Sequence, residues 1–251
     1  MIITSKSNPK IKEIASLKEK KFRKKSGLFV VEGYKMVSEA LASKKSVMLL
    51  VGTTEGLTRF ACEEIDKIEV SEEVLSYVSD AVTPQGVLAV LKEEYAEPKK
   101  PIMPCVLLDG VSDPGNLGTI IRTCAAVGVK DIYLVDCCDV YSPKTVRSSM
   151  SGIFFVNLII LKREEVKSVM QDTPIIVADM GGENVFTFNP PSVYCLVIGN
   201  EANGVSSEIE NLATHTVKIP MAKTSESLNA GVSLAVTLYE LTEGKNRSLI
   251  N

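Results

Sequence analysis

Residues 108–123 read LDGVSDPGNLGTIIRT, and this stretch has the layout of a buried strand that opens through a loop into a helix. The Pro-Gly pair in the loop favours a turn, and the apolar residues beyond it recur at helical spacing. We expect the helix to begin near Leu117, with Asn116 as the cap of its first turn. Arg122 is a cation in this otherwise apolar helix. It is either solvated or directed at a ligand, where its guanidinium would bind phosphate.

Two later stretches have the same layout. Residues 196–209, LVIGNEANGVSSEI, form an apolar strand that breaks at Gly199, where the backbone can approach a ligand closely, and Glu201 follows. Residues 217–236, VKIPMAKTSESLNAGVSLAV, pass from a short strand through a polar loop into a helix that begins near Asn229. The serines and asparagines of these loops could serve only as helix caps. Three such loops within about 130 residues nevertheless predict one composite site.

Strands and helices alternate along the chain, which predicts an α/β fold with a mostly parallel sheet. We expect helices at 9–25, 36–42, 59–65, 71–78, 117–127, 142–150 and 163–170 and a last helix that ends near Gly244, and strands at 28–32, 47–51, 86–91, 103–108, 131–135, 155–161, 175–179, 194–198 and 217–219. The charged, proline-bearing stretch 92–104 suits an exposed linker, so we expect domains at 1–95 and 102–251.

Charge is distributed unevenly along the chain. The 251 residues carry a net charge of -3, which by itself argues against a nucleic-acid-binding protein. Residues 1–25, however, contain nine basic and two acidic residues. A solvated helix face would explain this run, and so would a surface that follows RNA phosphates.

The cysteines and the apolar segments indicate whether the protein binds metal and where in the cell it acts. Six cysteines without CxxC spacing and a single histidine, His215, make a zinc site improbable, and we expect no metal. Free thiols in a reducing compartment are the simplest explanation of the cysteines. No apolar run reaches membrane-spanning length, and the opening MIITSKSNPK lacks a signal-peptide core. We therefore expect a soluble, cytoplasmic protein.

In this order and with this content, the three stretches resemble the signature motifs of the SpoU (TrmH-like) RNA 2′-O-ribose methyltransferases of the SPOUT class. The resemblance covers roughly Met103 to Leu241. A weaker one links GLFVVEG (27–33) and TPQGVLAV (83–90) to the L30e-like RNA-binding domain that often accompanies this catalytic domain. The resemblance implies a trefoil-knotted, mostly parallel sheet with helices on both faces, preceded by a small L30e-like α/β domain. Such a knot is one of the rare exceptions to unknotted folds.

The resemblance also implies a cofactor, S-adenosyl-L-methionine, and a site. The positions implied to hold the cofactor, largely through backbone, are Gly199, Ile219, Met221 and Leu228. The implied polar active-site set is Asn116, Arg122, Glu201, Ser227 and Asn229. Within it, Arg122 would anchor phosphate, Asn229 would orient the nucleotide, and Glu201 and Ser227 would fix the loops and neighbouring donors. The family usually forms homodimers with the site near the subunit interface, so Arg122 would be able to serve a site built partly by the other chain.

The sequence leaves open which RNA is the substrate, and two other classes of protein have to be considered. Ribosomal RNA is the substrate that the N-terminal resemblance favours, and transfer RNA is the alternative. A Rossmann-type dinucleotide enzyme is disfavoured because no GxGxxG follows any expected strand. A catalytically silent RNA-binding relative is disfavoured because all five polar active-site residues are present together.

Overall fold

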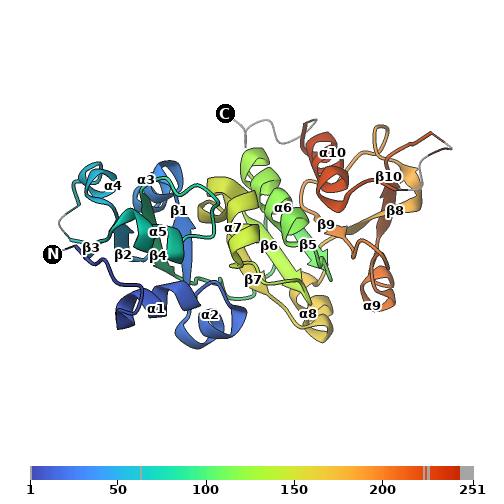
Figure 1. Ribbon diagram of the computed structural model, residues 1–251. Coiled ribbons are helices and arrows are strands. Elements are labelled where there is room, and N and C mark those ends of the chain that lie inside the picture. Colours follow the sequence, from blue (N-terminus) through green and yellow to red (C-terminus); the bar gives the residue numbers. More distant parts are fainter. Residues whose placement is uncertain (1, 63, 223, 225–226, 244–251) are drawn as a thin grey trace. The chain divides into compact units, whose positions relative to one another are not determined.

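The computed structural model describes residues 2–62, 64–222, 224 and 227–243 (Figure 1). The chain forms two compact units. We call residues 1–94 together with 141–154 the N-terminal unit, and residues 95–140 together with 155–251 the C-terminal unit. A segment from the second half of the chain, 141–154, is therefore part of the N-terminal unit.

The N-terminal unit is built on a four-stranded sheet with the order β1-β4-β2-β3. Strand β4 pairs antiparallel with β1 and with β2, and β2 pairs parallel with β3. Its elements are α1 (Pro9–Ser16), α2 (Lys20–Ser26), β1 (Leu28–Glu32), α3 (Tyr34–Ala42), β2 (Val47–Gly52), α4 (Thr54–Thr58), β3 (Lys67–Glu69), α5 (Glu72–Val78), β4 (Val87–Lys92), α7 (Pro143–Ser149) and the 3-10 helix η1 (Met150–Phe154).

Two expected helices of this unit differ in the structure. The helix expected at 9–25 is broken into α1 and α2, and the buried guanidinium of Arg23 donates to the carbonyls of Leu17 and Lys18 at the break. The helix expected at 59–65 is wrong. Helix α4 begins earlier because the Thr53 hydroxyl accepts a hydrogen bond from Gly56 N and caps it.

The C-terminal unit contains a six-stranded sheet with the order β10-β8-β9-β5-β6-β7, in which every pair of neighbours is parallel. The α/β fold with a mostly parallel sheet is thereby confirmed. The elements of this unit are β5 (Cys105–Asp109), α6 (Pro114–Val127), β6 (Asp131–Val135), β7 (Asn157–Ile160), η2 (Arg163–Glu165), α8 (Val166–Met170), β8 (Ile175–Asn184), β9 (Cys195–Ile198), α9 (Ser207–Glu210), β10 (His215–Lys218) and α10 (Ala230–Glu243).

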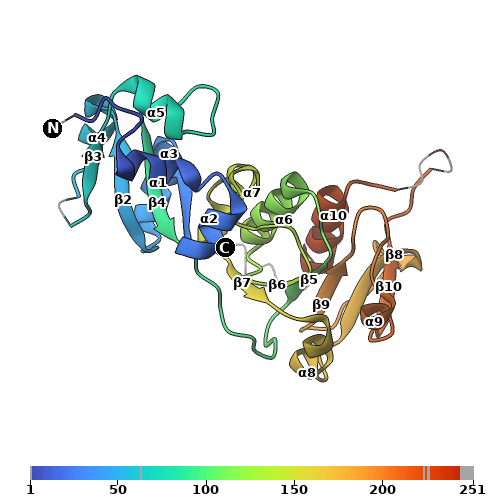
Figure 2. The same cartoon turned by 60° about the horizontal axis from the view of Figure 1, so that its bottom comes forward.

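Helices cover both faces of this sheet. On one face, Leu107 and Val197 belong to an apolar cluster with Val166 and Met170 of α8 and Ile209 of α9. The alternate residues of the central strands are buried as well, which requires a second cover. Helices α6 and α10 lie side by side there (Figures 1 and 2).

Strand order creates a switch point between β5 and β9. From β5 the chain proceeds outward through β6 and β7, and it returns to the other side of β5 for β8, β9 and β10. The loops that follow β5 and β9 therefore diverge from neighbouring strands, the place where open α/β sheets bind ligands. Here the two loops are joined by a 2.7 Å hydrogen bond from Asn200 Nδ2 to the carbonyl of Gly110.

Candidate active site

The carboxylate of Glu201 holds the loop between β5 and α6. Its Oε2 accepts from the backbone N and the hydroxyl of Ser112, at 3.2 and 2.9 Å. Its Oε1 accepts from Asp113 N at 3.2 Å and from Asn116 Nδ2 at 2.8 Å. Partial burial opposes ionisation, but the hydrogen bonds from Asn116 and Ser112 outweigh it and lower the pKa of Glu201 to about 2. The Glu201 side chain is therefore ionised, and its hydrogen bonds hold the loop after β9 to the loop after β5. We call this set of contacts the Glu201 clamp.

Asn116 does not cap helix α6, contrary to expectation. The helix begins at Pro114, and the Asp113 side chain caps it by accepting from Asn116 N at 2.9 Å. Asparagine and aspartate are comparable caps, so the earlier residue takes this position and leaves the Asn116 amide available. That amide donates to Glu201 and accepts from Asn229.

Asn229 joins the third motif to the first. Its Oδ1 accepts from Gly231 N at 2.9 Å and Val232 N at 3.3 Å and so caps helix α10, which is the alternative role that the sequence left open for this residue. Its Nδ2 donates to Asn116 Oδ1 at 2.7 Å. The side chains of Glu201, Asn116 and Asn229 thus form a continuous hydrogen-bonded row, which we call the polar row. Each comes from a different motif.

The other two polar residues are outside this row. Arg122 is exposed on α6, and within the described residues its side chain has no hydrogen-bond or ion-pair partner. An uncommitted guanidinium is available to a ligand such as phosphate. Ser227 is exposed and lines a cavity that begins next to Asn229.

This cavity has a volume of about 160 Å³ and lies between β8, the loop after β10, and α10. Three of the four expected cofactor positions line it, namely Ile219, Met221 and Leu228. Gly199 is not among its lining residues. A Cβ at Gly199 would lie 2.2 Å from the carbonyl carbon of Gly204, so the loop's own backbone already requires a glycine there.

Sequence reasoning missed the contribution of β8 to this cavity. Pairing with β10 jumps from Val177 to Glu183, and residues between them leave the regular ladder. Ala178, Asp179 and Met180 line the cavity as a result. A Cβ at Gly182 would lie 2.5 Å from the backbone of Thr216, so this position requires glycine. The Gly-Gly pair at 181–182 was therefore the sequence feature that could have indicated an irregularity in β8.

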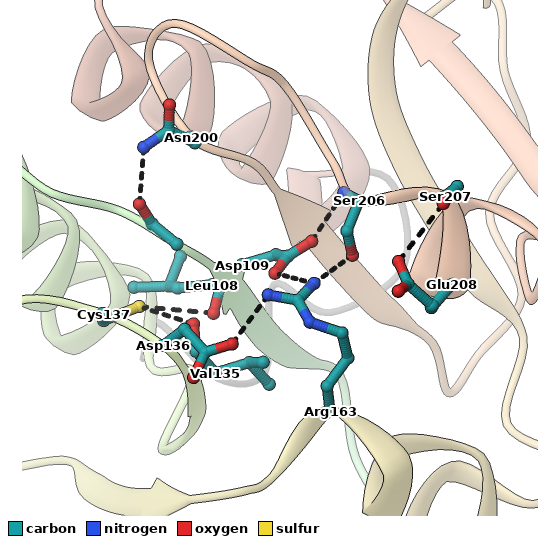
Figure 3. Close-up of polar contacts among 11 residues, drawn as sticks. Leu108, Asp109, Val135, Asp136, Cys137, Arg163, Asn200, Ser206, Ser207 and Glu208 are labelled. Atoms are coloured by element: carbon teal, nitrogen blue, oxygen red, sulfur yellow. Dashed lines mark hydrogen bonds and ion pairs between the residues drawn. The ribbon is translucent and has the colours of Figure 1, made fainter.

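A second missed feature is an ion-pair cluster under the loop after β9 (Figure 3). Arg163 Nη1 donates to Asp109 Oδ1 at 2.7 Å and to the Ser206 hydroxyl, and its Nη2 donates to Asp136 Oδ2 at 2.7 Å. Asp109 is only 2% exposed, and its Oδ2 accepts from Ser206 N at 2.7 Å. The cluster fixes the end of the loop that carries Glu201 to the end of β5.

The described residues offer neither a cluster of metal ligands nor a membrane-spanning helix. They contain no group of three or more His, Cys, Asp or Glu side chains placed to hold a metal ion. None of the helices in this part of the chain has the length and apolar character needed to cross a membrane.

Comparisons with known proteins cover nearly all of the chain. The SpoU rRNA Methylase family matches residues 103–239, and the MRM3-like substrate binding domain matches residues 8–89. The 23S rRNA (guanosine(2553)-2′-O)-methyltransferase RlmP of Bacillus subtilis is 31% identical over 95% of this chain and 98% of its own. An AdoMet-bound rRNA methyltransferase from Sinorhizobium meliloti superposes with a TM-score of 0.89 at 29% identity, over 98% of each chain. The SpoU methyltransferase AviRb from Streptomyces viridochromogenes, in complex with AdoMet, gives a TM-score of 0.83 at 26% identity, over 96% of this chain and 99% of that one.

Proposed function

The chain belongs to the SpoU rRNA Methylase family, and from this premise we propose that it is an enzyme that transfers the methyl group of S-adenosyl-L-methionine to a ribose 2′-hydroxyl of ribosomal RNA. The family expected from the three motifs is confirmed. The observation that carries the proposal is the polar row, because it joins one side chain from each motif beside a cavity. The two relatives whose structures contain AdoMet support the cofactor.

The cavity's lining fits this cofactor. Ile219, Met221 and Leu228 provide an apolar surface for an adenine ring, and Ser227 provides a hydroxyl at the same wall. Asp179 of β8 also lines the cavity, and its Oδ1 accepts a hydrogen bond from Gly181 N at 2.8 Å. Bound there, S-adenosyl-L-methionine would supply a sulfonium methyl that is already electrophilic. The protein's task is then to align a ribose hydroxyl and raise its nucleophilicity.

We assign a different role in this task to each of three polar residues. A guanidinium is a very weak acid and a poor general base, so we assign Arg122 to binding a substrate phosphate and to electrostatic stabilisation. Asn229 orients the nucleotide, with its amide fixed by the cap of α10 and by Asn116. Glu201 acts through the loop that it clamps and is a positioning residue.

The N-terminal region supports RNA as the substrate. Helix α2 carries Lys20, Lys21, Lys24 and Lys25, and α1 adds Lys10 and Lys12. Arg23 is excluded from this surface because its guanidinium is buried against backbone carbonyls. Clustered lysines of this kind track phosphates and make RNA affinity strongly salt-dependent.

Four finer assignments belong to the same proposal. Residues 1–95 bind the RNA substrate and residues 102–251 form the catalytic domain, in line with the ranges matched by the two families. The C-terminal part of the chain is threaded as a trefoil knot. Two chains form a homodimer that places Arg122 close to a site shared with its partner. The protein acts in the cytoplasm.

The test is transfer of labelled methyl groups from S-adenosyl-L-methionine to unmodified ribosomal RNA and, in parallel, to unmodified transfer RNA. We expect incorporation into ribosomal RNA, resistance to alkali at a single phosphodiester, and no incorporation with Asn229→Ala. Incorporation into transfer RNA alone would reassign the substrate. Cofactor binding without transfer to either RNA, or to ribosomal subunits, would indicate a silent RNA-binding relative.

A further inference from the structure

The N-terminal unit contains a second cavity, of about 370 Å³, that the proposed active site does not use. We call it the N-terminal cavity. It lies among the end of α1, strand β1, the start of α3, the segment after α5, and α7. Its wall includes the apolar side chains of Val30, Met36, Val146 and Met150. Cavities of this volume with a mostly apolar wall commonly hold ligands.

The cations that line the cavity exceed the acids. Lys35 is exposed and has no partner within the described residues. The Lys18 ammonium donates to the carbonyls of Tyr77 and Ser79 at 2.9 and 2.6 Å, and the Glu32 carboxylate, which also lines the cavity, accepts from the Ser79 hydroxyl and from Asp80 N. Arg147 is paired with Asp80 at 2.6 Å. The arrangement favours a ligand that carries negative charge beside an apolar part.

Strained backbone places one apolar side chain at the cavity. Met150, at the end of α7, has φ 50° and ψ -138°, which costs a residue with a side chain about 1–3 kcal/mol. Its side chain is nevertheless partly exposed, at 39%. Met36 also lines the cavity, and thioethers pack favourably against planar aromatic groups.

Hydrogen-bonding groups in the cavity and the surface next to it further restrict the kind of ligand that would fit. Thr83 and Gln85 line the cavity, are exposed, and have no hydrogen-bond partner in the described part of the chain, so they can bond to the edge of a planar ring. Leu17 and Lys18, also in the lining, lead directly into the lysine-rich helix α2. A polyanion bound along α2 would therefore pass the mouth of the cavity.

We infer that the N-terminal cavity receives one unstacked nucleotide of the RNA substrate. Its base lies between the thioethers of Met36 and Met150, and its phosphate lies near Lys35. This inference rests on the proposed function, since it takes RNA as the substrate. It adds a site for a nucleotide away from the one that is methylated.

The test uses two pairs of matched variants. Ala81 lines the cavity, so Ala81→Trp would fill it, whereas Ala81→Ser changes little volume. Lys35→Glu reverses the charge at the cavity, and Lys44→Glu makes the same change at an exposed lysine outside it. Stacking of one base is worth about 1–3 kcal/mol, so Ala81→Trp should weaken binding of unmodified ribosomal RNA transcript by about tenfold or more. Ala81→Ser should stay within about twofold, with thermal unfolding and cofactor binding unchanged in both variants.

A spectroscopic readout makes the test direct. With methionine methyl groups labelled by ¹³C, a short single-stranded RNA should shift the signals of Met36 and Met150 and leave Met48, exposed outside the cavity, unmoved. Unmoved Met36 and Met150 signals at saturating RNA, or equal RNA affinity of Ala81→Trp and Ala81→Ser, would overturn the inference. Saturation by 5′-AMP with the same affinity would also overturn it, in favour of a free nucleotide. None of these readouts requires methyl transfer, so failure of the proposed function is detected separately, in the methyl-transfer assay.

Discussion

Asn229 Nδ2 donates a 2.7 Å hydrogen bond to Asn116 Oδ1, although the two residues are 113 positions apart in the sequence. One residue caps helix α10 and the other lies in the first turn of α6, so this bond fixes the starts of two helices that pack side by side. A Cβ at Gly231 would lie 3.0 Å from Thr119 Cγ2, so a glycine allows this close approach of α10 to α6. The bond makes the orientation of Asn229 depend on Asn116, and through it on Glu201.

The two functions of Asn229 should separate by mutation. Asn229→Ala removes the cap of α10 and should lower the free energy of unfolding by about 1 kcal/mol as well as abolish methyl transfer. Asn229→Asp keeps a capping oxygen but has no amide to donate to Asn116, so it should fold normally and still lose about 100-fold or more in kcat. Urea unfolding and single-turnover methyl transfer measure the two effects. Normal turnover by Asn229→Asp would show that the amide has no role beyond the cap.

Mutation of Arg122 should affect methyl transfer but hardly affect stability, because Arg122 is exposed and no described residue pairs with it. Arg122→Ala should change the free energy of unfolding by no more than about 0.5 kcal/mol. Methyl transfer should fall by about 100-fold, since the group that binds the substrate phosphate is lost. Arg122→Lys should recover part of the rate, because it restores the charge without the planar fork. Near-normal transfer by Arg122→Ala, measured beside an inactive Asn229→Ala, would refute the role assigned to Arg122.

Features that neighbouring residues determine can be predicted from this sequence, whereas features that depend on contacts between distant segments cannot. Strands such as Leu28–Glu32 and Asp131–Val135 follow from local apolar runs, and the structure confirms their bounds. Caps are less certain, because Asp113 and Asn116 both suit a helix start, and only the partners of Asn116 in distant loops decide between them.

Contacts between distant segments carried no sequence signal. Arg163 and Asp109 are 54 positions apart, and nothing in the spacing of charges indicates that they meet. The excursion of β8 that lines the cofactor cavity depends on its register with β10, which a single sequence does not encode visibly. Residues 141–154 join the N-terminal unit for a similar reason, since α7 contacts β1 and η1 contacts α3.

The Glu201 clamp should make stability depend on pH in a defined window. The pKa of Glu201 is lowered from 4.5 to about 2 in the folded protein, so the folded state binds fewer protons than the unfolded state in this range. The stabilisation is complete above pH 4.5 and is lost as the pH falls toward 2. The difference in unfolding free energy between wild type and Glu201→Gln should therefore be constant from pH 7 to 5 and shrink below that. Ser112→Ala, which removes the 2.9 Å donor, should raise the folded-state pKa, so the loss should still begin near pH 4.5 but should be smaller and should end at a higher pH.

The cluster around Arg163 predicts unequal effects of removing its partners. Arg163→Ala would leave the carboxylate of Asp109, 2% exposed, with the donation from Ser206 but without its cation, and should lower the free energy of unfolding by about 3 kcal/mol. Asp136→Asn removes the other carboxylate, which is 68% exposed, and should cost about 1 kcal/mol or less. Asparagine also tolerates the φ of 50° at this position, so no backbone strain is added.

The same cluster should affect the cofactor site through the loop after β9. Arg163 reaches Ser206 directly and through Asp109, and Ser206 ends the loop that carries Glu201. Arg163→Lys keeps a cation near Asp109 but cannot hold Asp109, Asp136 and Ser206 at once, so it should fold yet bind S-adenosyl-L-methionine less tightly. Calorimetric titration of the cofactor into Arg163→Lys and Asp136→Asn measures this. Equal affinities of both variants and wild type would mean that the cluster stabilises the fold without positioning the loop.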